Sequence, residues 1–321
     1  MKKRLFKQMR CGAAATILLL ICALGSAQSA PATAPLPQEV TIRGVEFVLI
    51  PQGWFYKTGG QPQAGQELLL HDEYGGGNVR VWLDSYYLAK YEARARDLVA
   101  HLNSAEAKGV DYAGSTLSCS TGLGPAGKFI QLRPDEDLPA THLSWHLADS
   151  WARWMGFRLA SEMEWEKAAR GPDQRTYPWG EDYPDDTFAG YKTRSDCFTW
   201  PVNSFLKGRS PYGLHNMAGN VREFVADWYD IERDRKLQEG ERNPAPAATG
   251  ITQAGREGWD AGPWKILKGG RWGSDEEQIR IGARIYYLPD SAFRCNGTRF
   301  AIDAAAVREH LAKGTAVVTV R

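Results

Sequence analysis

The sequence predicts an α+β fold with much irregular structure. Two apolar stretches rich in β-branched residues, Val45–Ile50 and Val79–Leu83, are typical of strands. Two later stretches begin at the capping residues Ser144 and Ser161 and continue with the apolar spacing of short helices. The long stretch Val110–Arg133 is rich in glycine and serine and predicts a loop insertion. Strand and helix signals in one chain, joined by long loops, indicate the α+β class.

The first 27 residues have the pattern of a secretory signal peptide. Basic residues precede an apolar run from Ala13 to Leu24, and the small residues Gly25-Ser26-Ala27 follow it. We expect cleavage after Ala27, and then a proline-containing flexible leader over residues 28–40. The apolar run is too short to span a membrane. The sequence therefore predicts a periplasmic protein with no transmembrane segment after signal cleavage.

The charge of the mature chain argues against a nucleic-acid partner. After removal of the signal, 34 basic and 38 acidic residues remain, which gives a formal charge of −4. Nucleic-acid binding proteins carry basic patches, whereas here the basic residues are interspersed with acids.

Three cysteines remain in the mature chain: Cys119, Cys197 and Cys295. In an oxidising compartment they allow one disulfide and leave one thiol, and the sequence does not decide which pair forms.

The two helices have clear start and stop signals. Ser144 caps the first helix and Gly156 ends it. The second begins at Ser161, where Glu164 three residues on completes a capping box, and it stops at Gly171. Tryptophans at helical spacing predict core positions, and the acidic side chains are expected to be solvated. The tryptophans are Trp151, Trp154 and Trp165, and the acids are Asp149, Glu162 and Glu166.

The stretch Tyr212–Asp230 combines a polar, glycine- and asparagine-rich turn with a following apolar segment. It offers four candidate oxygen ligands: the side chain of Asn216, the main-chain carbonyls of Gly219 and Val221, and the carboxylate of Glu223. Hard oxygen ligands on a flexible loop suit calcium. Taken alone, the pattern is also that of a tight turn in which Glu223 caps main-chain amides.

Further motifs accompany this stretch in a fixed order. They are Pro139–Trp145, Gly156–Gly171, Tyr177–Gly180, Leu267–Trp272, Arg280, Arg284, Pro289-Asp290 and Gly297–Phe300. In this order and at these separations they resemble the formylglycine-generating-enzyme (sulfatase-modifying factor) family, from about Ile42 to Ile302. The resemblance implies the family's fold, a variant of the C-type-lectin fold, over residues 41–303.

The resemblance also implies two calcium sites. The family's Asn-x-x-Gly-x-x-x-Glu pattern maps without gaps onto Asn216, Gly219, Val221 and Glu223. At the second site Asp196 and Phe198 match, and Tyr191 is in place to supply a carbonyl, but Gly190 replaces the family's asparagine. The sequence therefore predicts calcium at the first site and leaves the second site open. The residues concerned at the second site are Tyr191, Asp196 and Phe198.

The family's catalytic residues are missing. A formylglycine-generating enzyme has a serine after its Gly-Gly pair and two cysteines shortly beyond, which bind copper. Here Arg271 follows Gly269-Gly270, and residues 272–288 contain no cysteine. Carboxylates cannot replace thiolates as ligands of a soft Cu(I) ion. We therefore do not expect this chain to oxidise sulfatase cysteines.

Two classes of function remain open. The first is a non-catalytic, calcium-binding periplasmic protein that acts through interaction with a periplasmic or membrane-associated protein partner. Among binding members of the family, the chain resembles the periplasmic regulator upstream of the threonine kinase that controls type VI secretion. The alternative is a periplasmic oxidoreductase of the family, similar to the pyoverdine-maturation protein.

The parts that this chain adds to the family core are candidate interaction surfaces. They are an insertion at Ile231–Trp264 and a C-terminal extension at residues 304–321, for which we expect a short helix and a final strand. Aromatic residues are predicted to line the old substrate cleft, although Trp272 also fits a core position. The cleft set is Arg271, Trp272, Tyr286 and Tyr287, with Trp259 and Trp264 nearby.

Overall fold

A computed structural model describes residues 34–58, 79–104, 119–124, 127–193, 198–230, 233, 236–247 and 263–319. The expected signal peptide, residues 1–27, and residues 28–33 of the expected leader lie outside these ranges, while the last two leader residues already belong to a strand. None of the helices within them has the length and apolar character needed to cross a bilayer.

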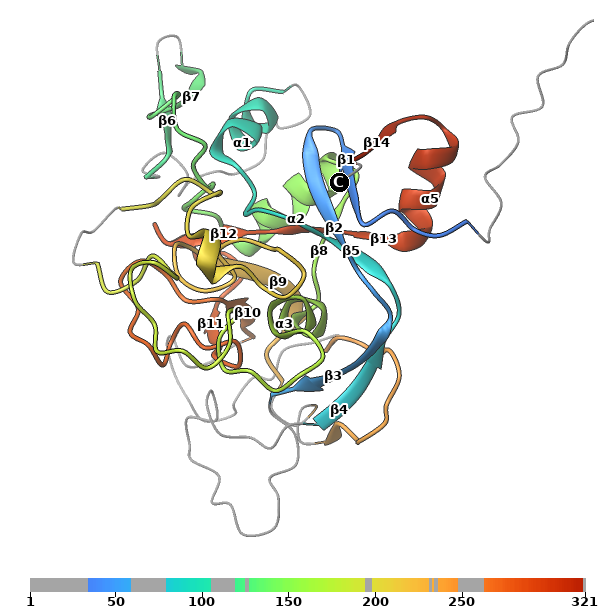
Figure 1. Cartoon of the computed structure of the whole chain (residues 1–321). Coiled ribbons are helices and arrows are strands. Elements are labelled where there is room, and N and C mark those ends of the chain that lie inside the picture. The colour runs from blue at the N-terminus through green and yellow to red at the C-terminus, as the bar shows by residue number, and fades with distance from the viewer. Residues whose placement is uncertain are drawn as a thin grey trace, which may run out of the picture.

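A six-stranded sheet runs through the fold (Figure 1). Its strand order is β14-β1-β2-β5-β13-β8, and every neighbouring pair is antiparallel. The strands span Ala316–Val318, Glu39–Ile42, Val45–Ile50, Tyr86–Ala89, Phe300–Asp303 and Arg158–Leu159, in that order. The predicted strand Val45–Ile50 is confirmed as β2.

A second, four-stranded sheet has the order β11-β10-β9-β12. Its strands span Ile285–Tyr287, Lys265–Lys268, Arg222–Trp228 and Asn296–Thr298. β9 lies in the middle, parallel to β12 and antiparallel to β10. Figure 1 shows this sheet beside α3, on the opposite side of the molecule from α5.

Two hairpins complete the strands. The first joins β3 (Gly53–Lys57) to β4 (Val79–Leu83), and the second strand has the predicted bounds. The second joins β6 (Thr121–Leu123) to β7 (Phe129–Gln131). This hairpin lies within Val110–Arg133, so the described part of that predicted loop contains regular structure.

The helices follow the predicted caps. α2 spans Trp145–Trp154, and the Ser144 side chain accepts a hydrogen bond from the Leu147 amide at 3.2 Å. α3 spans Glu162–Arg170, and its capping box is present in full between Ser161 and Glu164. The other described helical elements are α1 (Ala95–Leu102), the 3-10 turn η3 (Leu206–Gly208) and α5 (Ala304–Ala312).

Helix α2 packs on both large sheets, whereas α3 packs on the β3–β4 hairpin and on the four-stranded sheet. α2 packs on β8 and β9, while α3 packs on β3, β9 and β10. Trp151 and Trp165 are 0% and 1% exposed, as the helical spacing predicts, and Trp154 is half-buried. The C-terminal extension packs on its own domain, because β14 pairs with β1.

Candidate functional site

The loop before β9 carries the predicted calcium ligands into the interior. Asn216 has a left-handed conformation with φ 52°, as do Gly219 and Asn220 with φ 78° and 59°. Gly219 has to be glycine, because a Cβ there would lie 2.5 Å from the carbonyl oxygen of Gly190. Asn216 and Glu223 are 4% and 1% exposed. Both predicted side-chain ligands are therefore buried.

Glu223 is held by nitrogen donors. The Arg299 guanidinium donates through Nη2 to Oε1 at 2.7 Å and through Nε to Oε2 at 3.0 Å. The Trp165 indole also donates to Oε2, at 2.7 Å. Arg299 is itself 1% exposed, so this is a buried ion pair. Both carboxylate oxygens of Glu223 are thus already engaged.

Glu92, which the sequence analysis did not single out, lies in the same place. The side-chain amides of Asn216 and Asn220 both donate to its Oε2, at 2.9 and 3.0 Å. Its other oxygen, Oε1, has no hydrogen-bond partner among the described residues, and neither does Oδ1 of Asn216. Burial, together with the nearby Glu223 carboxylate, raises the pKa of Glu92 to about 8.

These residues fit a hard cation, but not in the arrangement that the motif implies. Glu92 and Asn216 each have a buried oxygen free to bind an ion, and buried polar oxygens normally have partners. Glu223, the carboxylate of the motif, would have to give up donors from Arg299 or Trp165 to bind calcium in bidentate fashion. The chemistry of calcium needs six to eight oxygens, so main-chain carbonyls would have to contribute.

The second calcium site lacks space for its missing asparagine. A Cβ added at Gly190 would lie 2.4 Å from the Trp200 ring. Tyr191 is half-buried and its hydroxyl donates to the Pro184 carbonyl at 2.6 Å, while Phe198 is 39% exposed. The predicted ligand Asp196 lies outside the described residues. The Trp200 ring therefore gives a physical reason for the glycine at this position.

The predicted aromatic cleft does not form one surface. Trp272 is 1% exposed and packs with Val221 and Cys295, so of the two positions that the sequence allowed it takes the one in the core. Trp264 is buried as well, at 5% exposed. Both rings are therefore buried, Trp272 as its alternative position predicts and Trp264 against the predicted exposure.

Tyr286 and Tyr287 point to opposite faces of β11, because successive side chains alternate along a strand. Tyr286 packs against Tyr229, with ring centroids 4.6 Å apart. The Tyr287 hydroxyl instead accepts a hydrogen bond from Arg222 at 2.9 Å. The remaining member of the set, Arg271, starts a turn in which its amide donates to the Ser274 hydroxyl at 3.1 Å. Trp259 lies outside the described residues.

The glycine pair before Arg271 is required by its backbone. Gly269 and Gly270 have φ values of 87° and 72°, and a Cβ at Gly270 would lie 2.7 Å from the Gln278 carbonyl oxygen. A cavity of about 20 Å³ lies beside Gly270, lined partly by Arg222 and Arg284. A space of this size holds about one water molecule.

Among the described cysteines, one is bonded and one is free. Cys119 is disulfide-bonded. Cys295 is a buried free thiol, and the Arg222 guanidinium lies 3.8 Å from its sulfur. The alternative that Cys119 pairs with Cys295 is therefore wrong.

The acidic side chains of α3 form a buried ionic network, so the expectation that Glu162 and Glu166 are solvated is wrong. They are 2% and 0% exposed, because α3 is covered on one side by β3 and on another by β9 and β10. Two lysines each contact both carboxylates, and one arginine binds each carboxylate. The lysine ion pairs run from Lys57 Nζ to Glu166 at 3.2 Å and from Lys268 Nζ to Glu162 at 3.5 Å. Arg284 binds Glu162 in bidentate fashion, and Arg170 binds Glu166 at 3.1 Å.

A signal for this network is present in the sequence. Residues two apart on a strand share a face, so Lys57 on β3 points to the same side as Phe55. Phe55 and Lys57 are 0% and 1% exposed. A lysine on the apolar face of a strand predicts a buried acidic partner, because buried lysine is costly unless paired.

Asp227 makes the stability of this region depend on pH. It accepts a hydrogen bond from the Glu162 amide at 2.7 Å, and burial together with the Glu162 charge raises its pKa to about 7. Because the folded state holds this proton more tightly than the unfolded state does, protonation of Asp227 stabilises the fold at low pH. This stabilisation is lost as the pH rises from about 4 to about 7. We expect Asp227→Asn to raise the unfolding free energy at pH 8 by about 1–3 kcal/mol, because it removes a buried negative charge. The gain is limited because the α3 N-terminus already stabilises part of that charge in the wild type.

Urea denaturation at pH 8 and at pH 4 measures this effect. The gain from Asp227→Asn should disappear at pH 4, where the folded wild type already carries the proton. Asp290→Asn, with its side chain 89% exposed, is the control and should change stability little at either pH. A gain in unfolding free energy of the same size at both pH values would contradict the raised pKa of Asp227.

The described part of the 231–264 insertion forms one wall of a groove of about 480 Å³. Asn243 and Pro244–Pro246 line this wall, opposite Arg158 and the N-terminal turn of α3. The Asn243 amide donates to Asp84 at 2.9 Å, which fixes the insertion against the end of β4. The groove is rich in carboxylates: Asp84, Asp149, Glu164 and Asp303 all line it.

Comparison with known proteins places the chain in a family. Residues 32–304 match the family described as "Sulfatase-modifying factor enzyme 1-like domain". A formylglycine-generating enzyme of Thermomonospora curvata is 36% identical over 193 residues, which are 55% of this chain and 59% of that enzyme. The inactive C-alpha-formylglycine-generating enzyme 2 of Mus musculus is 31% identical over 202 residues, covering 58% of this chain and 56% of the relative.

A serine/threonine-protein kinase, pkn1 of Chlamydia pneumoniae, is also similar, with 32% identity over 165 residues. These are 49% of this chain and 23% of the kinase. The matched region therefore spans at most 59% of the length of these three curated relatives.

Solved structures share the fold. PvdO from Pseudomonas aeruginosa superposes with a TM-score of 0.56 at 24% identity, covering 84% of this chain and all of PvdO. Treponema denticola variable protein 1 gives a TM-score of 0.54 at 17% identity, with coverage of 84% and 100%. These likenesses confirm the predicted α+β, C-type-lectin-like fold. Because the family match covers most of the residues and includes every motif from Pro139 to Phe300, this chain belongs to the formylglycine-generating-enzyme, or sulfatase-modifying factor, family.

Proposed function

We propose that this chain is a non-catalytic, calcium-binding member of the family that is exported to the periplasm and acts by binding another protein. The observation that carries the proposal is the segment after Gly269-Gly270. Arg271 follows the glycines, and residues 272–288 contain no cysteine to bind copper. Similarity to a relative named as an inactive formylglycine-generating enzyme supports the same view.

The proposed partner is a periplasmic or membrane-associated protein, and the proposed role is regulation upstream of the threonine kinase that controls type VI secretion. Similarity to part of a serine/threonine-protein kinase supports a connection of this domain with kinase signalling. The groove of about 480 Å³ beside Pro244–Pro246 is the proposed contact surface, because it combines the family core with the insertion. Replacing Pro244–Pro246 by glycines should reduce capture of the partner from periplasmic extract while thermal stability is retained.

The first test of the proposal is the metal content of the mature protein, purified without chelator and without added transition metals. Elemental mass spectrometry should find about one calcium per chain and no stoichiometric copper or iron. The protein should also leave the cysteine of a sulfatase-derived peptide unchanged, which mass spectrometry of the peptide measures.

The formylglycine-generating enzyme of a related organism, assayed with the same peptide, serves as the positive control. Stoichiometric copper or iron, or conversion of the peptide thiol to an aldehyde, would overturn the non-catalytic assignment. Such a result would favour the alternative, a periplasmic oxidoreductase of this family.

A further inference from the structure

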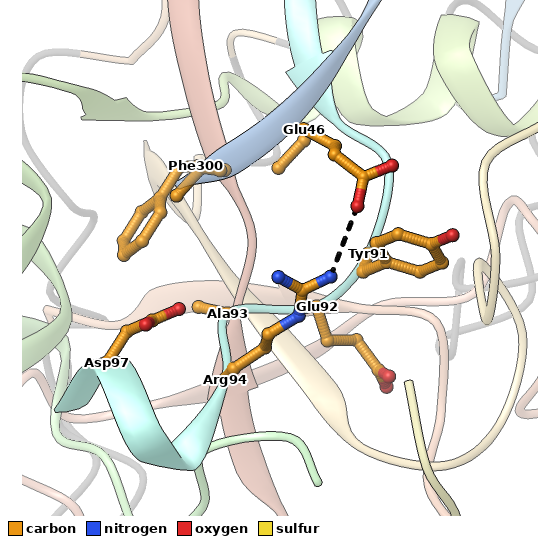
Figure 2. A pocket seen from close by; sticks show the side chains of 9 residues that line it. Glu46, Tyr91, Glu92, Ala93, Arg94, Asp97 and Phe300 are labelled. Atoms are coloured by element: carbon orange, nitrogen blue, oxygen red, sulfur yellow. Dashed lines mark ion pairs between the residues drawn. The ribbon is translucent and has the colours of Figure 1, made fainter. Parts of the chain in front are cut away.

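One buried arginine in the described part of the chain has no carboxylate partner. The other buried arginines each form an ion pair with an acidic side chain, as Figure 2 shows for Arg94 and Glu46. The pairs are Arg94 with Glu46, Arg170 with Glu166, Arg284 with Glu162 and Arg299 with Glu223. Arg222 is 6% exposed and forms no ion pair with a described carboxylate. It therefore differs from every other buried arginine that the structure describes.

The described side-chain contacts of Arg222 are with uncharged groups. Its Nη1 donates to the Tyr287 hydroxyl at 2.9 Å and lies 3.8 Å from the Cys295 sulfur. The Cys295 thiol is itself placed to donate to Asn296 Oδ1, at 3.8 Å. Nε of Arg222 is buried and has no hydrogen-bond partner among the described residues. Because arginine does not lose its proton in proteins, this buried positive charge requires a counter-charge.

The register of the four-stranded sheet places the Arg222 side chain beside the cavity of about 20 Å³. Arg222 and Phe224 lie two residues apart on β9, so they share a face of the sheet. Phe224 is paired with Leu267 on β10, which is paired with Ile285 on β11, and Leu267 and Ile285 both line the cavity. To reach Tyr287 on β11, the Arg222 side chain crosses β10 on that face. The guanidinium therefore passes along the cavity wall.

The cavity suits a small anion by its charge and its size. Of the described residues that line it, two are arginines, Arg222 and Arg284, and none is acidic. Arg284 is paired with Glu162, so the charge that remains to be balanced is that of Arg222. A space of about 20 Å³ holds one particle of about the size of a water molecule, which excludes phosphate, sulfate and carboxylate ligands. A monatomic anion meets both conditions.

We propose that this cavity is a binding site for a halide ion, with chloride as the natural ligand, and that Arg222 holds the ion through a charge-assisted hydrogen bond from Nε. The ion balances the buried charge of Arg222. It also links β9 to the segment after Gly269-Gly270, because Gly270 and Gln278 line the same cavity. This inference depends neither on the proposed calcium binding nor on a protein partner.

Thermal unfolding of the mature protein, followed by tryptophan fluorescence, tests the site. Sodium chloride replaces sodium gluconate at constant ionic strength, because gluconate is too large for the cavity. The melting temperature of the wild type should rise with chloride and then level off, by about 2–5 °C when chloride is about tenfold above its dissociation constant. Arg222→Met, which removes the buried charge, should show no such rise. Arg80→Met removes a surface arginine paired with Glu239 and is the matched control, which should respond to chloride as the wild type does.

Bromide gives a second measurement that needs no variant. Crystals of the wild type soaked in sodium bromide should show an anomalous-scattering peak in the cavity, next to Nε of Arg222. This measurement decides the question if Arg222→Met does not fold.

Any one of three results overturns the proposal. The first is a wild-type melting temperature that is equal in chloride and in gluconate. The second is an equal chloride response in Arg222→Met, which would place the ion elsewhere. The third is the lack of a bromide peak in the cavity, which would make water its occupant. Each of these results would leave the proposed function unaffected.

Discussion

Replacing Arg299 with methionine is expected to lower the free energy of unfolding by about 3–5 kcal/mol. Methionine retains much of the volume of the side chain but leaves Glu223, 1% exposed, without a counter-charge. It also removes the donors that Arg299 provides to the carbonyls of Ala89, Lys90 and His215. Urea denaturation at pH 7, followed by tryptophan fluorescence, measures the change.

Arg80→Met is the control for this substitution. Arg80 pairs with Glu239 on the surface, where its side chain is 47% exposed, so the loss should stay below about 1 kcal/mol. Equal losses from the two substitutions would show that the Arg299 pair contributes no more than a surface ion pair. Arg299→Lys should recover only part of the stability, because lysine cannot reproduce the planar set of donors.

Replacing Glu166 with glutamine is expected to lower the unfolding free energy at pH 7 by about 3 kcal/mol. Burial alone would raise the pKa of Glu166, but Lys57, Lys268 and Arg170 lower it to about 2. A carboxyl group with a lowered pKa stabilises the fold at pH values above its pKa in the unfolded state. This stabilisation is lost as the pH falls from about 4.5 to about 2. The difference in unfolding free energy between the wild type and Glu166→Gln should therefore become smaller over that pH range.

Denaturation curves at pH 7, 4.5 and 3 measure the difference in unfolding free energy between the wild type and Glu166→Gln. Glu309→Gln is a suitable comparison, because the Glu309 side chain is 69% exposed and forms a surface pair with Lys313. Its effect should be small at every pH. A gap for Glu166→Gln that does not change with pH would mean that lost packing, and not the charge of the carboxylate, causes the destabilisation.

Much of the local structure can be predicted from the sequence. The capped helices after Ser144 and Ser161 and the strands Val45–Ile50 and Val79–Leu83 are present, because their signals lie within a few neighbouring residues. The hairpin β6–β7 was missed inside a glycine- and serine-rich stretch. Its strands have only three residues each, which is too short for a periodic pattern to appear.

The site is harder to predict, because its residues come together only in the folded chain. Asn216 and Glu223 share one short motif, but Glu92 and Arg299 reach the same place from distant parts of the sequence. Glu162 and Glu166 were misread because a helical pattern identifies one apolar face and cannot show that a second sheet covers the other. A buried charge therefore has to be inferred from residues that could pair with it. Lys57, on the apolar face of a strand, is the clearest indication of the buried carboxylates.

The position of β13 has a consequence for how the protein is made. This strand, Phe300–Asp303, lies inside the six-stranded sheet between β5 and β8, although it comes near the end of the chain. A growing chain cannot close the sheet until Phe300–Asp303 has been synthesised. Until then β5 exposes a row of unpaired main-chain groups, which is the kind of edge that aggregates. We expect a chain truncated before Phe300 to lack the strand that joins β5 to β8, and therefore to leave this sheet incomplete.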